Sequence, residues 1–412
     1  MNSATCTGRP RPSCTGCNNR QPSFVSGSPH EPLPVFNQGM DDAFDDPPPQ
    51  VILPPLSRKG RGATLNMVSR YDTQQRERVD DGWWLEEEAG GPPPLKTTLI
   101  VDTAKSVISY NASPDLPFDR SINPYRGCEH GCIYCYARPS HAYLGFSPGL
   151  DFETKILYKP DAVAVLKSEL AKASYECAPI ALGMNTDAWQ PAERKLGITR
   201  GILELLAECK HPFGTVTKSA LILRDLDLLK DMARQNLCHV AVTITTLDPE
   251  LARKSEPRAA SPARRLEIVR ELSAAGIPVG VSMAPMIPAL NDHEMESIMA
   301  AAVEAGASNT WYTLLRLPHE LSPLFRDWLE THVPGRARHV MSVIQQMRGG
   351  KDYDSDFSTR MRGEGEFARL LQQRYRIAVK RLNIERHREA WPQLDCSRFV
   401  KPRKPSPQGE LF

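Results

Sequence analysis

The sequence predicts an α/β protein built on an open, partial (β/α)6 barrel of TIM-like type. From about residue 121 onward, short apolar runs alternate with stretches of helical periodicity. Candidate strands recur at spacings of about 25–40 residues with a helix in each gap, the pattern of βαβ units and of a parallel sheet with right-handed crossovers. Six such units fill the ~200 residues available, fewer than the eight units and ~250 residues of a closed barrel. A doubly wound sheet is the alternative architecture.

Six strands are expected in the barrel, beginning near Ser121, Ile180, Gly214, His239, Pro278 and Thr310. Helices are expected between them, near 161–173, 199–209, 224–235, 261–275 and 293–305. The fourth helix shows the reasoning: Ser261 is an N-cap, Pro262 suits the first turn, and Gly276 stops the helix. In either architecture the active site belongs at the carboxyl ends of the strands.

Composition divides the 412-residue chain into five regions. Residues 1–57 are rich in Pro, Ser, Gly and Asp and have too little periodic apolar content to repay the entropy of ordering, so a disordered region is expected. An ordered leader that packs on the core is expected over residues 58–120, and the catalytic core over 121–335. A C-terminal helical extension over 336–390 and a flexible basic tail over 391–412 complete the chain.

The overall charge is nearly balanced, with 51 Lys and Arg against 49 Asp and Glu and a net charge of +2. This balance excludes a polycation held to nucleic acid by bulk charge, so any such contact has to be local. No apolar run approaches the ~18 residues of a membrane span, and the N-terminus lacks the apolar region of a secretory signal. A cytoplasmic protein with no membrane partner is expected, with its ten cysteines as reduced thiols.

Three cysteines, Cys128, Cys132 and Cys135, are grouped in RGCEHGCIYCYARPS, directly after the first candidate strand. A [4Fe-4S] cluster usually takes one thiolate per iron, so three closely spaced cysteines can hold three irons and leave the fourth open to a substrate or cosubstrate. The alternatives are a zinc site with His130 or His141 as fourth ligand, and unrelated thiols. Zinc motifs generally combine two short-spaced pairs at a distance, and no second pair follows downstream.

The C-x3-C-x2-C spacing, with Tyr134 just before the third cysteine, resembles the radical S-adenosylmethionine (SAM) superfamily. The segments GMNTDAWQPAE, TVTKSALILRDLDLL, TITTLDPELARKSEPRAASPARRLE and APMIPALND are similar to the spore photoproduct lyase-related branch, in particular to DNA-repair photolyase-like proteins of unassigned substrate. The resemblance covers about residues 58–385. It implies a [4Fe-4S] cluster, SAM bound to its open iron, a 5′-deoxyadenosyl radical that abstracts hydrogen, and a reductant such as flavodoxin or ferredoxin.

The resemblance also implies SAM-binding groups at the ends of successive strands. Lys218 brings an ammonium to the SAM carboxylate, where charge assistance roughly doubles the strength of a hydrogen bond. Ordinary polarity at strand ends is the alternative for each position taken alone. The cofactor-binding residues are thus expected to be Tyr134, Thr186, Asp187, Lys218, Thr243 and Ala284.

Two tyrosines, Tyr134 and Tyr136, match the catalytic radical relay of spore photoproduct lyases. Those lyases carry a hydrogen-donating cysteine on the second strand, whereas this chain has Met184 there, which has no thiol hydrogen to give. The resemblance therefore does not extend to repair of the spore dimer. Cys177 precedes the strand by several residues and is a candidate substitute, with a structural buried cysteine as the alternative.

Several further residues allow two interpretations. His319 and Glu320 follow the sixth strand and offer either acid–base chemistry or helix capping and ion pairs. Glu256 and Arg258 offer either contacts to SAM or substrate, or a loop ion pair, and residues 348–365 are a candidate lid. The N-terminal cysteines lie in the Pro- and Ser-rich region and are interpreted as free thiols; these are Cys6, Cys14 and Cys17.

The C-terminal region concentrates positive charge, because residues 358–412 carry 13 Lys and Arg against 6 Asp and Glu. A helix is expected over 366–384 with its arginines away from the apolar stripe, as a solvated face or a phosphate-contacting one. The last five residues resemble the Q-x-x-L-F peptide by which bacterial repair and replication enzymes bind the DNA sliding clamp, through Gln408, Leu411 and Phe412. An inert tail is the alternative.

The sequence thus favours a radical SAM enzyme that abstracts hydrogen from its substrate, with nucleic-acid repair or modification as the expected setting. The alternative is a noncatalytic iron–sulfur protein for electron transfer or redox sensing, recruited to DNA through its C-terminal tail.

Overall fold

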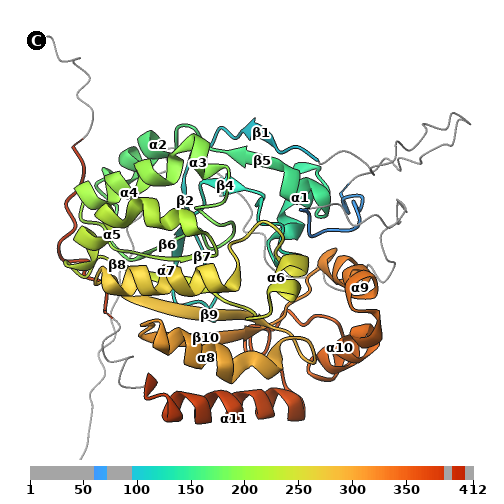
Figure 1. Ribbon diagram of the computed structural model, residues 1–412. Helices are drawn as coiled ribbons and strands as arrows, with labels where there is room; N and C mark the ends of the chain where they lie inside the picture. The colour runs from blue at the N-terminus through green and yellow to red at the C-terminus, as the bar shows by residue number, and fades with distance from the viewer. Residues whose placement is uncertain (1–59, 72–94, 385–391, 404–412) are drawn as a thin grey trace, which may run out of the picture. The chain divides into compact units, whose positions relative to one another are not determined.

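The six expected strands form the parallel part of a single sheet in the computed structural model, which describes residues 60–71, 95–384 and 392–403 (Figure 1). The sheet has seven strands in the order β10-β9-β8-β7-β6-β3-β2. All neighbours are parallel except β2, which pairs antiparallel with β3. The bounds are β2 (Ile108–Tyr110), β3 (Arg120–Ile122), β6 (Ile180–Leu182), β7 (Phe213–Thr217), β8 (Cys238–Thr243), β9 (Val279–Met286) and β10 (Asn309–Leu314).

The strand order separates the two architectures that the sequence allowed. From β3 to β10, strands that are neighbours in the sheet also follow one another among the sheet's strands along the chain, so every crossover moves in the same direction. A doubly wound sheet reverses direction at a switch point, and this sheet does not. Among the described residues β10 and β2 are its two edges, which confirms an open, partial barrel.

The helices that cover the barrel lie where the sequence predicts them. They are α2 (Ala162–Leu170), α4 (Ile198–Glu208), α5 (Leu226–Ala233), α7 (Pro262–Ala274) and α8 (Met295–Glu304). In α7 the Ser261 side chain accepts a hydrogen bond from the Arg264 backbone N–H, and Val269 and Leu272 are fully buried. The N-cap, the proline in the first turn and the apolar face therefore all act as the sequence indicates.

A second, small sheet lies beside the barrel. It consists of β1 (Thr98–Val101), β5 (Lys155–Tyr158) and β4 (Tyr125–Arg126), in the order β1-β5-β4. β5 follows the short helix α1 (Leu150–Thr154), and β4 leads directly into the three cysteines. Strand β1 belongs to the expected leader, so this part of the leader joins the structure through backbone pairing.

Two hydrophobic clusters stabilise the described structure. The larger lies between the barrel strands and their covering helices. The smaller packs Ile133 and Tyr134, next to the cysteines, against Trp328 and Leu329 of α9 (Leu321–His332) and Val340 of α10 (Pro334–Gln346). The region around the cysteines is therefore part of a core. None of the described helices is long and apolar enough to cross a membrane.

The expected C-terminal extension, residues 336–390, contains most of α10 and all of α11 (Gly365–Arg381), whereas α9 lies within the expected core. In Figure 1, α11 lies along α8. The candidate lid between α10 and α11 is fastened down, because the buried Arg348 donates hydrogen bonds to the carbonyls of Leu315, Thr359 and Arg360. Arg360 also pairs with Asp115 at 2.6 Å, across to the β2–β3 connection. Residues 1–57, with Cys6, Cys14 and Cys17, and the tail residues from 404 onward lie outside the described residues, so their roles stay predictions.

Candidate active site

The three cysteines lie in a loop that follows β3 and β4, which we call the cysteine loop (residues 127–138). Cys128 and Cys132 are each 7% exposed and Cys135 is half-buried. The parallel strands β6 to β10 all end at the same edge of the sheet as β3, since carboxyl ends of parallel strands face one way. The loop therefore shares this edge with the residues that the sequence marks at the ends of β6, β7, β8 and β9.

Backbone and side-chain hydrogen bonds fasten the cysteine loop to three other segments. The Cys128 N–H donates to the carbonyl of Phe152 at 2.9 Å, and the Ile133 N–H donates to that of Ser255 at 3.0 Å, at the end of α6 (Pro249–Ser255). The Gln190 side chain accepts from the Glu129 N–H at 2.9 Å and donates to the Gly127 carbonyl at 3.1 Å. The loop is thus held rigid from several sides, as a metal site requires.

A fully buried ion pair also supports the cysteine loop. Arg138 and Glu153 are each 0% exposed, and their side chains meet at 2.5 Å. The Arg138 guanidinium also donates to the carbonyls of Gly131 at 3.0 Å and Cys132 at 2.9 Å, in the cysteine loop itself. Because a buried charge needs a partner and satisfied hydrogen bonds, this pair fixes the backbone path between the cysteines.

The leader segment 60–71 reaches the cysteine loop through the same glutamate. Glu153 accepts hydrogen bonds from the backbone N–H groups of Gly62 at 3.0 Å and Ala63 at 2.8 Å. The approach is so close that a Cβ added at Gly62 would lie 1.8 Å from the carbonyl oxygen of Gly131. Only glycine allows the leader to lie here.

We therefore predict that Gly62→Ala lowers the free energy of unfolding by about 1–3 kcal/mol, the usual cost of overpacking, and increases protease cleavage in the leader. The matched control is Gly335→Ala in α10, where an added Cβ meets nothing within 4 Å and helix propensity favours alanine by about 1 kcal/mol. Thermal unfolding and timed proteolysis measure both effects. Equal melting temperatures for Gly62→Ala and the parent would contradict the close approach.

The environment of the thiols fits a cluster of irons. Burial raises the pKa of Cys132 to about 12, and burial, Asp187 and the other two cysteines raise the pKa of Cys128 well above its usual value. Thiol ligands have to be deprotonated, and a bound metal ion provides the positive charge that deprotonates them. Three neighbouring thiols, two of them buried, that repel one another as thiolates are therefore suited to a cationic group placed among them.

The two histidines of the zinc alternative contact other groups. No group of three or more His, Cys, Asp or Glu side chains within 60–71, 95–384 and 392–403 is placed to hold one metal ion. His130 Nδ1 faces Asp187 at 3.3 Å, and His141 Nε2 lies 3.0 Å from the Lys155 carbonyl. A [4Fe-4S] cluster asks for a different arrangement, because each thiolate binds its own iron.

The predicted cofactor residues Thr186 and Asp187, after β6, connect the elements of this edge. The Asp187 carboxylate accepts hydrogen bonds from the Thr217 hydroxyl at 2.9 Å and the Lys218 backbone N–H at 2.8 Å, while it also faces His130. The Thr186 hydroxyl donates to the Tyr125 carbonyl at 2.8 Å. Asp187 therefore ties the end of β7 to the cysteine loop, a positioning role that the sequence does not indicate.

Lys218 and Tyr134 lie together beside the thiols. The Lys218 ammonium is 5.8 Å from the centre of the Tyr134 ring, within the range of a cation–π contact, and its positive charge lowers the pKa of Cys132 against the effect of burial. The Tyr134 hydroxyl is buried and has no hydrogen-bond partner among the described residues. A half-buried cation and an unpaired buried hydroxyl next to three thiols are groups that a polar ligand can satisfy.

Tyr136 lies at the open side of the cysteine loop, with 43% of its surface exposed. Its hydroxyl donates a hydrogen bond to the Met184 carbonyl, and the Arg316 guanidinium lies 4.4 Å above its ring. Arg316 follows β10, so Tyr136 connects the ends of β6 and β10. The backbone of Met184 thus contacts one of the two predicted catalytic tyrosines.

The remaining predicted residues, Thr243 and Ala284, stand near the carboxyl ends of β8 and β9. The Thr243 carbonyl accepts a hydrogen bond from Arg265 at 3.1 Å, and Arg265 also pairs with the fully buried Glu256. Glu256 accepts from the Thr245 hydroxyl at 2.9 Å as well. Of the two interpretations of the segment at 256–258, the structure therefore shows the ion pairs, with Arg258 3.1 Å from Glu129.

Sequence reasoning missed most of the buried charge at this edge. Glu320, a candidate for acid–base chemistry, instead pairs with Arg70 of the leader at 2.7 Å and is 2% exposed. Arg138 and Glu153 gave no signal, because an isolated Arg or Glu in a sequence is expected on the surface. Their only trace in the sequence is their closeness to the cysteines.

Comparison with known proteins agrees with this geometry. Residues 122–302 match the radical SAM superfamily. An uncharacterized protein of Mycobacterium bovis is 38% identical over 216 residues, which cover 52% of this chain and 64% of that protein. An uncharacterized protein of Methanocaldococcus jannaschii is 27% identical over 239 residues, which cover 58% of this chain and 85% of that protein. The chain thus spans 64% of the length of the mycobacterial relative.

Solved structures of spore photoproduct lyase are similar to this chain at low identity. One, with bound AdoMet and dinucleoside spore photoproduct, is 16% identical and has a TM-score of 0.45, with 69% of this chain and 79% of that one covered. The matched residues 122–302 contain the cysteine loop and run from β3 to α8. The cysteine spacing and the open barrel agree with the match of residues 122–302 to the radical SAM superfamily.

Proposed function

We propose that this protein is a radical SAM enzyme in which Cys128, Cys132 and Cys135 hold a [4Fe-4S] cluster. The observation that carries the proposal is the rigid loop of three thiols, two buried and one half-buried, beside Lys218 and Tyr134 at the carboxyl edge of an open barrel. When bound, such a cluster with SAM supplies one-electron cleavage of the sulfonium and a 5′-deoxyadenosyl radical for hydrogen abstraction.

The residues of the chain contribute binding and orientation. The Lys218 ammonium offers a charge-assisted hydrogen bond to a carboxylate, and the buried Tyr134 hydroxyl offers another donor. Thr186 and Asp187 keep the β6 and β7 ends in register with the cysteine loop, and Thr243 and Ala284 border the same space. Tyr134 and Tyr136 are proposed as the relay between substrate and cofactor.

Cleavage of SAM tests the proposal directly. The full chain, purified and reconstituted with iron and sulfide without oxygen, should form 5′-deoxyadenosine from SAM after reduction by dithionite. Absence of both cluster absorbance and 5′-deoxyadenosine would contradict the proposal that this protein is a radical SAM enzyme. A cluster without cleavage is the result expected of the noncatalytic iron–sulfur protein for electron transfer or redox sensing, and zinc in place of iron excludes both functions.

The setting we propose is repair or modification of nucleic acid in the cytoplasm, with flavodoxin or ferredoxin as the reductant. Support comes from the sequence resemblance to the photolyase-like branch. Met184 stands beside Tyr136 at the position of the hydrogen-donating cysteine, so we propose a reaction that ends without that donor. Deuterium transfer from a labelled nucleic acid into 5′-deoxyadenosine would identify the molecule that loses hydrogen.

We further propose that the C-terminal residues Gln408, Leu411 and Phe412 bind the DNA sliding clamp. Binding through a second, tethered site raises the effective concentration of an enzyme at its substrate. A peptide of the last twelve residues should bind the clamp with a Kd of about 1–100 μM, corresponding to roughly 5.5–8 kcal/mol. A peptide with Leu411 and Phe412 replaced by alanine serves as control. Equal titration curves for the two peptides would contradict the prediction.

A further inference from the structure

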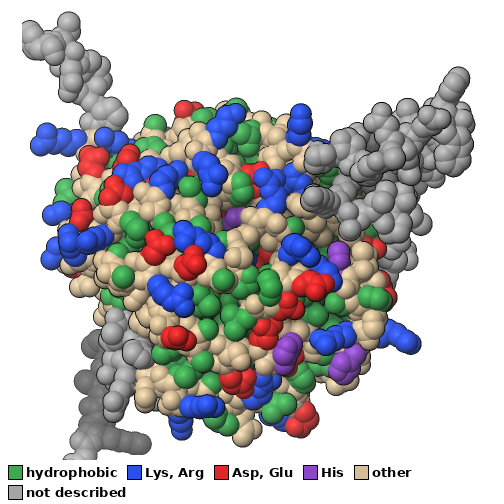
Figure 2. All heavy atoms as spheres, viewed as in Figure 1, with side chains coloured by type: hydrophobic (Ala, Val, Ile, Leu, Met, Phe, Trp, Pro, Cys, Tyr) green, Lys and Arg blue, Asp and Glu red, His purple; other side chains and the backbone are tan. Residues whose placement is uncertain are grey.

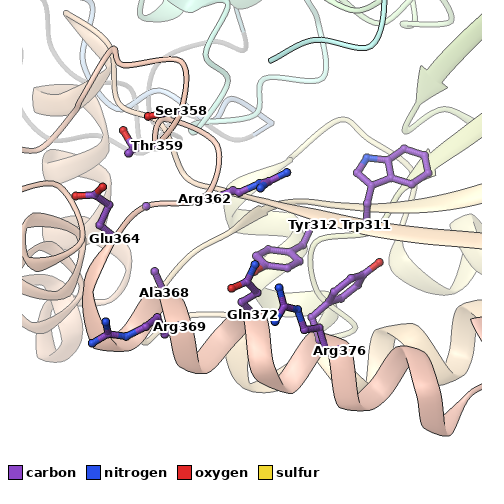
Figure 3. A pocket seen from close by; sticks show the side chains of 12 residues that line it. Trp311, Tyr312, Ser358, Thr359, Arg362, Glu364, Ala368, Arg369, Gln372 and Arg376 are labelled. Carbon is purple, nitrogen blue, oxygen red and sulfur yellow. The ribbon is translucent and has the colours of Figure 1, made fainter. Parts of the chain in front are cut away.

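A groove opens at the edge of the barrel, away from the cysteine loop. It has a volume of about 640 Å³ and lies between β10, the end of the 347–364 segment and α11 (Figure 3). Tyr312 and Trp311 come from β10, Arg362 from the segment, and Arg369 and Arg376 from α11. Strand β10 is an edge of the seven-stranded sheet, so no further described strand pairs with it on its outer side. The other walls of the groove come from α11 and the end of the 347–364 segment.

The charge of the groove is positive. Three arginines, Arg362, Arg369 and Arg376, line it against one acid, Glu364. Arg369 does pair with Glu366, but that carboxylate is 92% exposed, and exposed pairs of this kind contribute at most about 1 kcal/mol. An incoming anion can therefore compete with Glu366 for the guanidinium.

The position of the arginines on α11 is directional. Arg369 and Arg376 are seven residues apart, so they share one face of the helix and are separated by about 10.5 Å along its axis. Arg374 lies on another face and is already committed to Glu296 at 2.7 Å and Asp292 at 3.3 Å. Arg374 is therefore on the face of α11 that packs on α8. Arg369 and Arg376 are on the face toward the groove, where the acidic residues are Glu364 and Glu366.

Aromatic rings stand on the opposite wall. Trp311 and Tyr312 line the groove from β10, and the Tyr312 ring packs 5.1 Å from that of Tyr375 on α11. Paired aromatic rings beside a row of cations are the combination by which proteins bind single strands, with bases on the rings and phosphates at the cations. A ligand of phosphate alone would use only the cationic wall.

The groove and the candidate active site are connected through β10. Arg316 follows the carboxyl end of this strand and lies over the Tyr136 ring, and it is four residues beyond Tyr312, a distance of about 13 Å in an extended strand. An extended chain held in the groove can therefore continue to the cysteine loop.

We propose that this groove binds single-stranded nucleic acid, with Arg362, Arg369 and Arg376 at the phosphates and bases against Trp311 and Tyr312. The part that leads a strand to the cysteine loop rests on the proposed function; the binding itself does not. On the face shown in Figure 2, basic and acidic side chains are interspersed, and the net charge of the whole chain is only +2. Binding here is therefore local, as the sequence requires.

Binding is tested with a fluorescein-labelled 12-nucleotide single strand, titrated into the full chain without SAM or reductant, so that a failure of radical chemistry leaves the result intact. The variant R369Q/R376Q should bind at least about tenfold more weakly, because it loses two charge-assisted contacts to phosphates. The slope of log K against log salt should fall by about 1.4 for two lost phosphate contacts.

The control variant R234Q/R264Q removes the same charge from α5 and α7, where both arginines form surface ion pairs similar to that of Arg369. It should bind as the parent does. Equal losses of affinity in the two variants, or no binding by the parent, would overturn the proposal that the groove binds nucleic acid. Displacement of the strand by inorganic phosphate at matched phosphate concentration would show a simple anion site. Equal affinity for the corresponding duplex would show that bases do not stack on the aromatic rings. Either result also overturns the proposal. Circular dichroism verifies the fold of each variant.

Discussion

Cys132→Ala binds little iron and forms 5′-deoxyadenosine only at the level measured without protein. Cys132 lies in the middle of the cysteine loop, is 7% exposed, and its backbone carbonyl is held by Arg138 at 2.9 Å. In the proposed cluster, each of the three thiolates binds its own iron, so removing the Cys132 thiol leaves one iron without its protein ligand. Iron content and the product of SAM cleavage are measured on the same anaerobic preparation.

Cys209→Ala is the matched control for this result. Cys209 is as buried as Cys132, at 2% exposed, and lies at the end of α4, outside the cysteine loop. It should retain the iron and the 5′-deoxyadenosine of the parent, with only the modest loss of stability of a small buried side chain. A Cys132→Ala variant with full iron content and full SAM cleavage would show that the cluster lies elsewhere.

Arg138→Met lowers the free energy of unfolding by about 3–5 kcal/mol and also reduces the iron bound by the protein that stays folded. The stability loss arises because Glu153 is then left as a fully buried carboxylate without its cation. Total stabilities are about 5–15 kcal/mol, so the effect is large. The iron loss arises because Gly131 and Cys132 lose the guanidinium that positions their carbonyls. Denaturant unfolding and iron per folded protein measure the two effects separately.

The double variant R138M/E153Q separates charge from position. Removing both charges takes away the unpaired carboxylate, so the free energy of unfolding should recover by more than about 1 kcal/mol relative to Arg138→Met alone. Iron content should stay low, because a glutamine restores none of the contacts to Gly131 and Cys132. Recovery of both quantities, or of neither, would argue against a positioning role for Arg138.

The fold followed closely from periodicity in the sequence. All six expected strands and all five expected helices are present, and α7 begins at Pro262 after the Ser261 cap, as its sequence indicates. Local pattern suffices here because a buried parallel strand and an amphipathic helix each repeat their apolar residues at a fixed period. The choice between an open barrel and a doubly wound sheet came only from the strand order, which depends on pairing between distant segments.

The candidate site, too, could be predicted only in part from the sequence. The three cysteines were visible because they are close together in the sequence and their spacing is specific. Asp187 was expected at the cofactor, yet its carboxylate joins His130, Thr217 and the Lys218 backbone. The groove combines β10 with α11, more than fifty residues later, and its arginines gave only an ambiguous basic face in the sequence.

By itself, the sequence determined that this chain is an α/β protein with a parallel sheet and three cysteines at a strand end, because these features depend on residues within a few positions of one another. Only the tertiary structure decided which charges are buried and which groups they bind. Glu153 pairs with Arg138 and accepts hydrogen bonds from the leader. Glu320 pairs with Arg70, and Glu256 pairs with Arg265. A lone charged residue has the same local sequence pattern whether it is solvated or buried. A charged side chain can be buried only when a partner of opposite charge lies beside it, and the fold determines which residue that partner is.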